Sequence, residues 1–195
     1  MKLFLTQKNK KQGGFTLIET LVAVSIFTVS VLTMLVILGQ GISSTGYAKQ
    51  KSTAGYLAQE GMEYIRNMRD TYVLYSASAG VGWTTFVNTK MLPNCGTPKA
   101  CYFDPVNLFS LGTNMPVTQM AVTTCPNSNS CPNLLYDSGT GRYGYASGTA
   151  SGFVRQITVS QVSADELKVT STVYWTQGSR VYSTSFSENL FNWVE

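Results

Sequence analysis

A carboxylate and a latent amine lie close together near the start of this chain. Glu19 sits in an otherwise apolar stretch, and cleavage of the backbone after Gly14 would create an α-amine on Phe15, four residues earlier. A carboxylate inside a membrane costs about 2.5 kcal/mol or more unless it has a partner, and this amine is an obvious one. In an assembly the amine can come from a neighbouring chain. The spacing therefore predicts proteolytic processing followed by ion pairing.

Four cysteines form a second set of reactive residues, arranged as Cys95 with Cys101 and Cys125 with Cys131, and five residues lie inside each pair. Zinc is one interpretation, but structural zinc sites favour about two to four residues between paired ligands, and the chain has no histidine. In an exported domain, an even number of cysteines indicates disulfides. Three pairings remain open from the sequence, and we favour local closure of each pair, which would stiffen surface loops.

The residues needed for catalysis are poorly represented. The absence of histidine removes the commonest general base and the commonest metal ligand. Asp104 and Asp137 are isolated among turn residues, and Gly139–Arg142 lacks the lysine and the strand-to-helix setting of a phosphate-binding loop. We therefore predict no catalytic residue, no metal site and no cofactor, and a protein that is not an enzyme.

The positive charge is confined to one end of the chain. The formal net charge is +4, with 14 basic and 10 acidic residues. Four lysines, and no acidic residue, precede Phe15: Lys2, Lys8, Lys10 and Lys11. The remainder is neutral, which gives no strong sign of nucleic-acid binding.

An uncharged run of 19 residues from Thr20 to Leu38 is long enough to cross a bilayer as a helix. The cluster of four lysines on its N-terminal side places that side in the cytoplasm and the rest of the chain outside. An ordinary signal peptide, cut near the small residues at 39–41, is one alternative, and an uncleaved anchor with a single span is another. The run exceeds the usual apolar region of a signal peptide, about 7–15 residues, and neither alternative gives Glu19 a partner.

The segment Gly14-Phe15-Thr16-Leu17-Ile18-Glu19, with its basic leader and long apolar run, resembles the class III signal of type IV pilins and pseudopilins. The resemblance covers about the first 60 residues. It implies cleavage between Gly14 and Phe15 by a prepilin peptidase and N-methylation of the new N-terminal phenylalanine. It also implies that Glu19 pairs with the Phe15 amine of an adjacent subunit.

The elements that would position these residues are a long helix and a sheet. Apolar residues between Ala54 and Met68 recur at helical spacing, so one helix is expected from Phe15 to about Asp70. Three glycines within it, Gly39, Gly41 and Gly46, indicate either a loop or bend at the membrane surface or a segment that unwinds when subunits pack.

Beyond Tyr72 the composition is typical of turns and short strands. Alternating apolar residues predict strands at 153–162, 167–175 and 180–186, which together form an antiparallel meander. The helical stripe would cover its apolar face. The tail at 188–193 is expected either to extend the sheet or to lie along its edge. The predicted fold is α+β and pilin-like, with a long N-terminal α-helix on a C-terminal antiparallel sheet.

The leader at 1–14 is expected to be removed, and the transmembrane and assembly helix follows at 15–42. An amphipathic continuation of that helix is expected at 43–71, and an extracytoplasmic β-rich domain at 72–195. We predict a prepilin-type subunit, a minor one, of a type IV pilus or a type II secretion-like pseudopilus. Its partners would be the prepilin peptidase, other pilin subunits, the assembly machinery and the membrane. The alternative is a binding module at a filament tip, an adhesin or DNA-uptake receptor, marked by a contiguous basic or aromatic patch.

Overall fold

The computed structural model describes residues 13–105, 120–126 and 130–193. They form two units, which divide after Gly46. The first contains most of the apolar half of α1 (Leu17–Leu74), and the second contains the rest of α1 and all other elements. The expected helix is therefore present, beginning two residues later and ending four residues later than Asp70. It continues through Gly39, Gly41 and Gly46 without a loop.

Three long strands form the main part of the sheet in the second unit. They are β5 (Thr149–Ser163), β6 (Glu166–Gln177) and β7 (Arg180–Phe191), paired antiparallel in sequence order. The predicted meander is confirmed, with longer strands than expected. The tail continues β7 as far as Phe191, because Leu190 packs into the core and Phe191 pairs with Glu166. Gly178, at a φ of +61°, occupies the tight turn between β6 and β7.

Shorter strands complete the other side of β5. They are β1 (Cys101–Tyr102), β2 (Thr123–Thr124), β3 (Asn133–Asp137) and β4 (Arg142–Gly144). Because Val154 pairs with both Asn133 of β3 and Tyr174 of β6, β3 must lie on the edge of β5 opposite to β6. β4 pairs with β3, and β2 pairs with β1, which also adjoins β5.

The expectation of turns and short strands after Tyr72 is wrong for residues 79–95, which are helical. They form α2 (Ala79–Thr84), the π-helical segment η1 (Thr85–Met91) and α3 (Leu92–Cys95). Trp83, Phe86, Val87 and Met91 are all buried. Their spacing of three, one and four is a helical signal, although neighbouring glycines and a proline obscure it.

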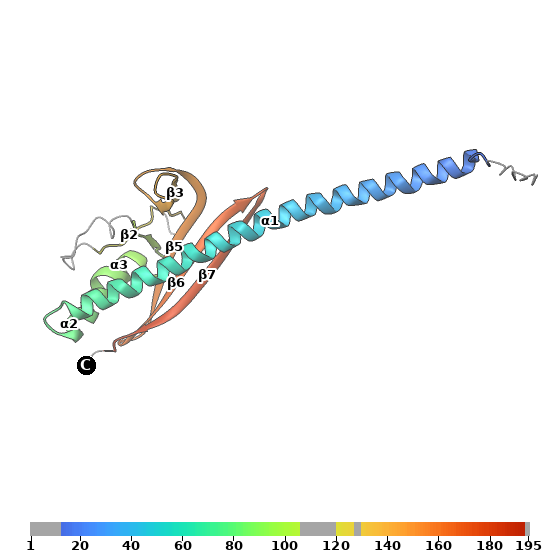
Figure 1. Ribbon diagram of the computed structural model, residues 1–195. Coiled ribbons are helices and arrows are strands. Elements are labelled where there is room, and N and C mark those ends of the chain that lie inside the picture. The colour runs from blue at the N-terminus through green and yellow to red at the C-terminus, as the bar shows by residue number, and fades with distance from the viewer. Residues whose placement is uncertain (1–12, 106–119, 127–129, 194–195) are drawn as a thin grey trace, which may run out of the picture. The chain divides into compact units, whose positions relative to one another are not determined.

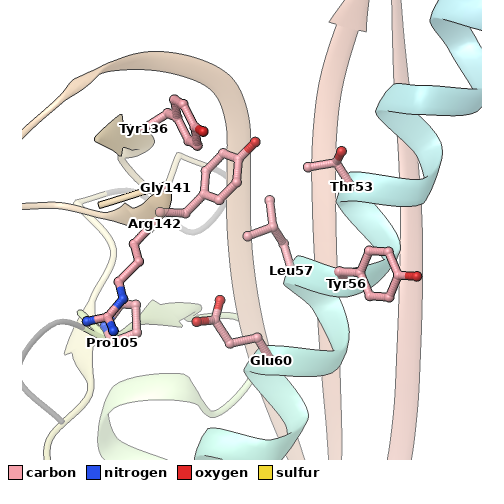
Figure 2. A pocket seen from close by; sticks show the side chains of 9 residues that line it. Thr53, Tyr56, Leu57, Glu60, Pro105, Tyr136, Gly141 and Arg142 are labelled. Carbon is pink, nitrogen blue, oxygen red and sulfur yellow. The ribbon is translucent and has the colours of Figure 1, made fainter. Parts of the chain in front are cut away.

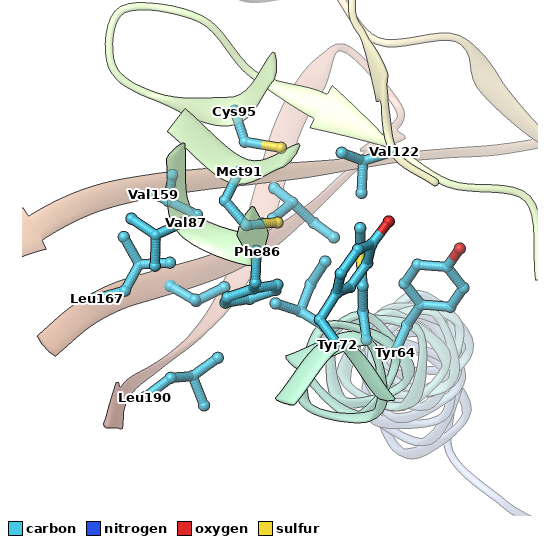
Figure 3. Close-up of a cluster of buried hydrophobic side chains, with 14 of the residues drawn as sticks. Tyr64, Tyr72, Phe86, Val87, Met91, Cys95, Val122, Val159, Leu167 and Leu190 are labelled. Carbon is cyan, nitrogen blue, oxygen red and sulfur yellow. The ribbon is translucent and has the colours of Figure 1, made fainter. Parts of the chain in front are cut away.

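The C-terminal half of α1 lies against the sheet and supplies one side of the core (Figure 1). Figure 3 shows Tyr64 and Tyr72 of this helix facing Val159, Leu167 and Leu190, from three successive strands, with the η1 side chains between them. The buried helical positions are the predicted apolar stripe, and burial of each large apolar side chain contributes about 1.5–3 kcal/mol. The α+β, pilin-like architecture is therefore confirmed.

Candidate functional site

The predicted cleavage site lies immediately before the helix. Gly13 and Gly14 have no regular secondary structure and are exposed, and Phe15 keeps 85 % of its surface exposed. A Cβ added to either glycine would meet no atom within 4 Å. A peptidase thus has an accessible backbone without regular secondary structure to bind, just ahead of Leu17, where α1 begins.

Glu19 has a partner within its own chain. Its Oε2 accepts hydrogen bonds from the backbone N–H and the hydroxyl of Thr16, both at 3.1 Å. In return the Glu19 N–H donates to Thr16 Oγ1 at 3.3 Å. This is a capping box, in which a threonine at the N-cap and a glutamate at the third helical position satisfy each other's backbone donors. The Thr-x-x-Glu pattern was visible in the sequence, and the sequence analysis missed it.

The capping box lowers the free-energy cost of placing the Glu19 carboxylate in an apolar segment. Both hydrogen bonds from Thr16 are accepted by Oε2, and within the described residues Oε1 makes no hydrogen bond. One carboxylate oxygen therefore takes part in the N-cap of the helix, while the other is available to accept a hydrogen bond from a further donor. The sequence analysis gave Glu19 only an intermolecular role; the structure adds an intramolecular one.

The first half of α1 is long and apolar enough to cross a membrane, with a mean hydropathy of 2.7 over its best 18-residue window. None of that window is buried within the protein. Hydroxyls in the run donate to backbone carbonyls of the preceding turn, as Ser25 does to Val22 and Ser30 to Ile26. These bonds satisfy the polar atoms without a water molecule, so the outer surface of the helix remains compatible with lipid.

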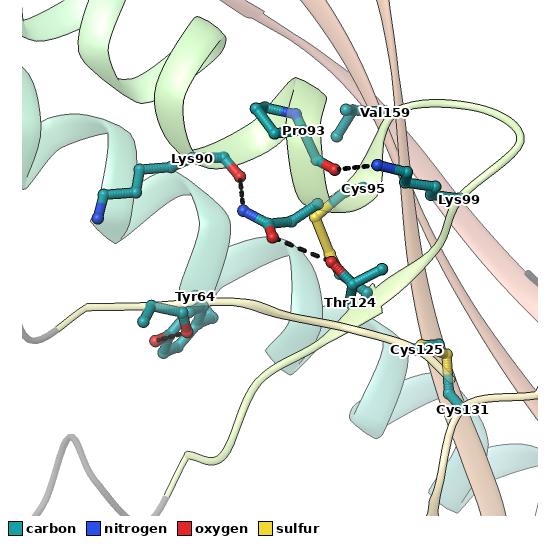
Figure 4. The surroundings of a disulfide bond; sticks show 12 residues. Tyr64, Lys90, Pro93, Cys95, Lys99, Thr124, Cys125, Cys131 and Val159 are labelled. Atoms are coloured by element: carbon teal, nitrogen blue, oxygen red, sulfur yellow. Dashed lines mark hydrogen bonds between the residues drawn. A yellow bond between two sulfur atoms is a disulfide. The ribbon is translucent and has the colours of Figure 1, made fainter. Parts of the chain in front are cut away.

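The four cysteines form two local disulfides, Cys95–Cys101 and Cys125–Cys131. The first lies in the main core, where it connects α3 to β1, and the second lies in a smaller cluster near Val154. Figure 4 shows the first bond beside a short polar chain, in which Thr124 Oγ1 donates to the Asn94 side chain, which donates to the Lys90 carbonyl. The loops are thus tied to the body of the domain.

A buried arginine was missed by the sequence analysis. Arg155 of β5 is fully buried, and its Nη1 donates to Glu60 Oε2 of α1 at 2.6 Å. Its guanidinium carbon lies 3.9 Å from the centre of the Phe103 ring, which stacks on Tyr64 at 3.7 Å. Inward and outward side chains alternate along β5, which places position 155 on the same face as the core residues Phe153 and Ile157. This alternation could have predicted that Arg155 is buried.

Comparison with known families matches residues 9–35 to the prokaryotic N-terminal methylation motif. The comparison with curated proteins found no match, and neither did the comparison with solved structures. The chain therefore carries the class III signal of type IV pilins, followed by a long N-terminal apolar helix. Together with the α+β domain, this signal supports a type IV pilin-like prepilin subunit that is anchored in a membrane.

Proposed function

We propose that the chain is a structural subunit that is cleaved after Gly14 and incorporated through its N-terminal helix into a type IV pilus or a type II secretion-like pseudopilus. The methylation motif at residues 9–35 is the observation that carries this proposal. It coincides with an exposed Gly14 and with a helix that begins immediately beyond the cut. A prepilin peptidase and a methylating activity on the new Phe15 amine are the implied partners.

Cleavage would change the electrostatics of the N-terminus. It removes the four lysines of the leader and leaves a neutral subunit with one α-amine on Phe15. The new amine belongs to Phe15, the residue next to Thr16. The N–H of Thr16 already donates a hydrogen bond to the Glu19 carboxylate. Oε1 of Glu19, which makes no hydrogen bond within the described part of the chain, can then accept a hydrogen bond from the amine of an adjacent subunit. This pairing would lower the cost of burying both charges in a filament core.

The proposed arrangement in the cell follows from charge and chemistry. The lysine-rich leader of residues 1–14 faces the cytoplasm, and residues 15–42 span the membrane. The amphipathic continuation at 43–71 and the domain at 72–195 lie outside, where an oxidising setting favours both disulfides. We assign the chain a structural role rather than a catalytic one.

We favour a minor subunit over the abundant one. The domain beyond Tyr72 is large and rich in loops, and no proline interrupts the apolar half of α1. Many major pilins carry such a proline. The helix nevertheless includes Gly39 and Gly41, which are exposed and where an added Cβ would meet no atom within 4 Å. These glycines would allow local unwinding during packing.

The processing step is tested by Gly14→Val in cells that contain the prepilin peptidase. Mass spectrometry should find the wild-type mature chain beginning with N-methylated Phe15, and the variant retaining its leader. Gly13→Val is the matched control, because it changes the neighbouring glycine and leaves the scissile bond intact; it should be processed. A Gly14→Val chain that still begins at Phe15 would disprove the cleavage assignment.

The role of Glu19 is tested by separating its charge from its capping function. Glu19→Gln keeps a carbonyl oxygen that can accept from Thr16, but it removes the negative charge. Thr16→Val removes the cap and keeps the charge. We expect Glu19→Gln to insert in the membrane but to be lost from sheared filaments, and Thr16→Val to be retained. Equal losses for both variants would show that capping, and not charge pairing, is what assembly needs.

A further inference from the structure

One edge of the sheet is long and unprotected. β7 pairs with β6 on one side, and within the described residues no strand pairs with its other side. The strand has 12 residues, contains neither lysine nor proline, and follows β6 without a bulge. Proteins usually protect edge strands with these devices or by keeping them short, as in β2 and β4, which have two and three residues. The backbone of β7 is therefore open to pairing with another strand.

The helix α1 does not cover this edge. Leu57 of α1 belongs to the same core cluster as Val173 of β6. Figure 2 shows Leu57 and Glu60 directed toward the β3–β4 hairpin, on the side of β5 away from β6 and β7. Apolar side chains of β7 consequently remain in solvent, with Val181 70 % exposed and Phe186 39 % exposed.

The sequence of β7 is complementary to itself. In an antiparallel pair, side chains directly opposite each other lie on the same face and interact. When two copies of β7 pair about Thr184, Arg180 lies opposite the partner's Glu188, Tyr182 lies opposite the partner's Phe186, and Thr184 lies opposite its own copy. Opposite-charge, aromatic and threonine pairs are all favourable across strands. A shift of two residues in either direction would place Arg180 opposite an apolar side chain, so the charges select this register.

The carboxylate of Glu188 has capacity for a second cation. It already accepts from Arg66, which also binds Glu63 at 2.6 Å, so that two carboxylates share one guanidinium and one negative charge is in excess. The Glu188 side chain is 38 % exposed, and a carboxylate has lone pairs for several donors. Arg180 is exposed and makes no ion pair with any described residue. The Arg180 of a second copy would neutralise the excess charge.

We propose that β7 is an interface with a second copy of this chain, joined edge to edge as an antiparallel strand pair with two-fold symmetry about Thr184. The same surface is used by both copies, as in other two-fold contacts. The pairing reverses the direction of the second unit between the copies. Subunits that lie side by side in one membrane or one filament share a direction, so the pairing joins copies carried by separate filaments. This last step rests on the proposed function, whereas the pairing itself rests on β7.

Single cysteines test the register. Both native cysteine pairs form disulfides, so an added cysteine is the one free thiol. Thr184→Cys lies opposite its own copy, within reach of a disulfide. Ser187→Cys is the control on the same strand, since the register places it about 20 Å from its copy. Mild oxidation of the full mature chain in detergent should cross-link Thr184→Cys into a dimer on a non-reducing gel and leave Ser187→Cys monomeric. Equal cross-linking of the two variants, or none with Thr184→Cys, would overturn the proposal.

Charge reversal tests the ion pairs. A contact made by one strand pair is small, so sedimentation of the mature chain in detergent should give a dimer with a Kd on the order of 10 μM. Arg180→Glu replaces two attractions with two repulsions and should weaken the dimer by about tenfold or more. Lys168→Glu is the control, because it makes the same change in charge at an exposed position on β6, which has no free edge. Circular dichroism checks that both variants are folded.

Two sedimentation results would overturn the proposal. One is a chain that stays monomeric up to about 500 μM, well above the expected Kd. The other is a dimer that Arg180→Glu leaves unchanged or that Lys168→Glu weakens equally, as expected if the apolar half of α1 causes the association. Neither result affects the tests at Gly14 and Glu19, which concern processing and incorporation.

The direction of the pairing is tested with vesicles that carry the mature chain with its domain outside. Wild-type vesicles should cluster, as measured by light scattering, because copies on facing vesicles have opposite directions. Vesicles with Arg180→Glu should cluster much less, and those with Lys168→Glu should behave like the wild type. A dimer that forms in detergent without clustering the vesicles would contradict the contact between separate filaments.

Discussion

Glu60 and Arg155, which are 95 residues apart in the sequence, form an ion pair of 2.6 Å that joins α1 to β5. The arginine is completely buried, while the glutamate side chain is 40 % exposed. The pair thus contributes to the packing of the helix on the sheet and to the orientation of the Glu60 carboxylate.

Glu60→Ala should destabilise the domain by about 3 kcal/mol, because it leaves a buried guanidinium without its counter-ion. The value is at the low end of the range for buried pairs, since Glu60 is partly solvated. Urea unfolding followed by circular dichroism measures the change. Glu63→Ala is the matched control: it removes an exposed partner of Arg66, which retains Glu188, and should cost less than about 1 kcal/mol. Equal effects of the two substitutions would contradict a structural role for the Arg155 pair.

At Gly61, α1 approaches the sheet closely. A Cβ at this position would collide with the buried Ser171 Oγ and lie 3.2 Å from Ser171 Cβ and 3.4 Å from Arg155 Cδ. Gly61→Ala should therefore lower the free energy of unfolding by about 1–3 kcal/mol, despite alanine's better helix propensity. Gly55→Ala lies on the same helix with no atom within 4 Å of the added carbon, and it should be neutral or stabilising by up to about 1 kcal/mol.

The clash at Gly61 can be tested further with a double variant. Within the described residues Ser171 Oγ is buried and makes no hydrogen bond, so Ser171→Ala should cost little by itself. In the Gly61→Ala background it should restore part of the lost stability by removing the nearest atom. If the two substitutions are simply additive in urea unfolding, the steric explanation is wrong.

The two disulfides should contribute unequally, although each joins cysteines six positions apart. The chain-entropy contribution is about 2 kcal/mol for loops of this size and is the same for both. Cys95 and Cys101 are fully buried in the main core, whereas Cys125 and Cys131 belong to a cluster of three buried residues. Replacing the first pair with alanines should therefore cost more than replacing the second, measured by thermal and urea unfolding of the two double variants. A larger loss for the second pair would contradict this ranking.

Alkaline pH should weaken the domain through Tyr145. Burial raises the pKa of Tyr145 to about 12, against the opposing effect of the Arg155 charge. The unfolded chain ionises near pH 10, so the contribution to stability is complete below about pH 10 and is lost as the pH rises to about 12. Tyr145→Phe should lose less stability than the wild type between about pH 9 and 12, measured by urea unfolding across that window. Parallel curves for the two proteins would show that Tyr145 is not the group responsible.

Local patterns were sufficient to predict the class III signal, the long helix and the C-terminal meander, but not the helical segments between Ala79 and Cys95. The class III signal, the uncharged span, the helical stripe and the alternating strands each depend on residues close together in the sequence. The helix boundaries shifted by a few residues, and the tail became the end of β7, because packing of Leu190 decides where a strand ends. The capping box of Thr16 and Glu19 is equally local and could have been predicted.

The sequence by itself determined where the chain is expected to be cut, which segment can enter a membrane, and which faces of the helix and strands are apolar, because these properties follow from composition and periodicity. Only the tertiary structure decided which distant groups meet. The burial of Arg155, its pairing with Glu60 and the close approach at Gly61 all depend on how α1 lies across the strands. That packing is set by complementary shapes and desolvated charges contributed by segments far apart in the chain, and no periodicity within one segment records it.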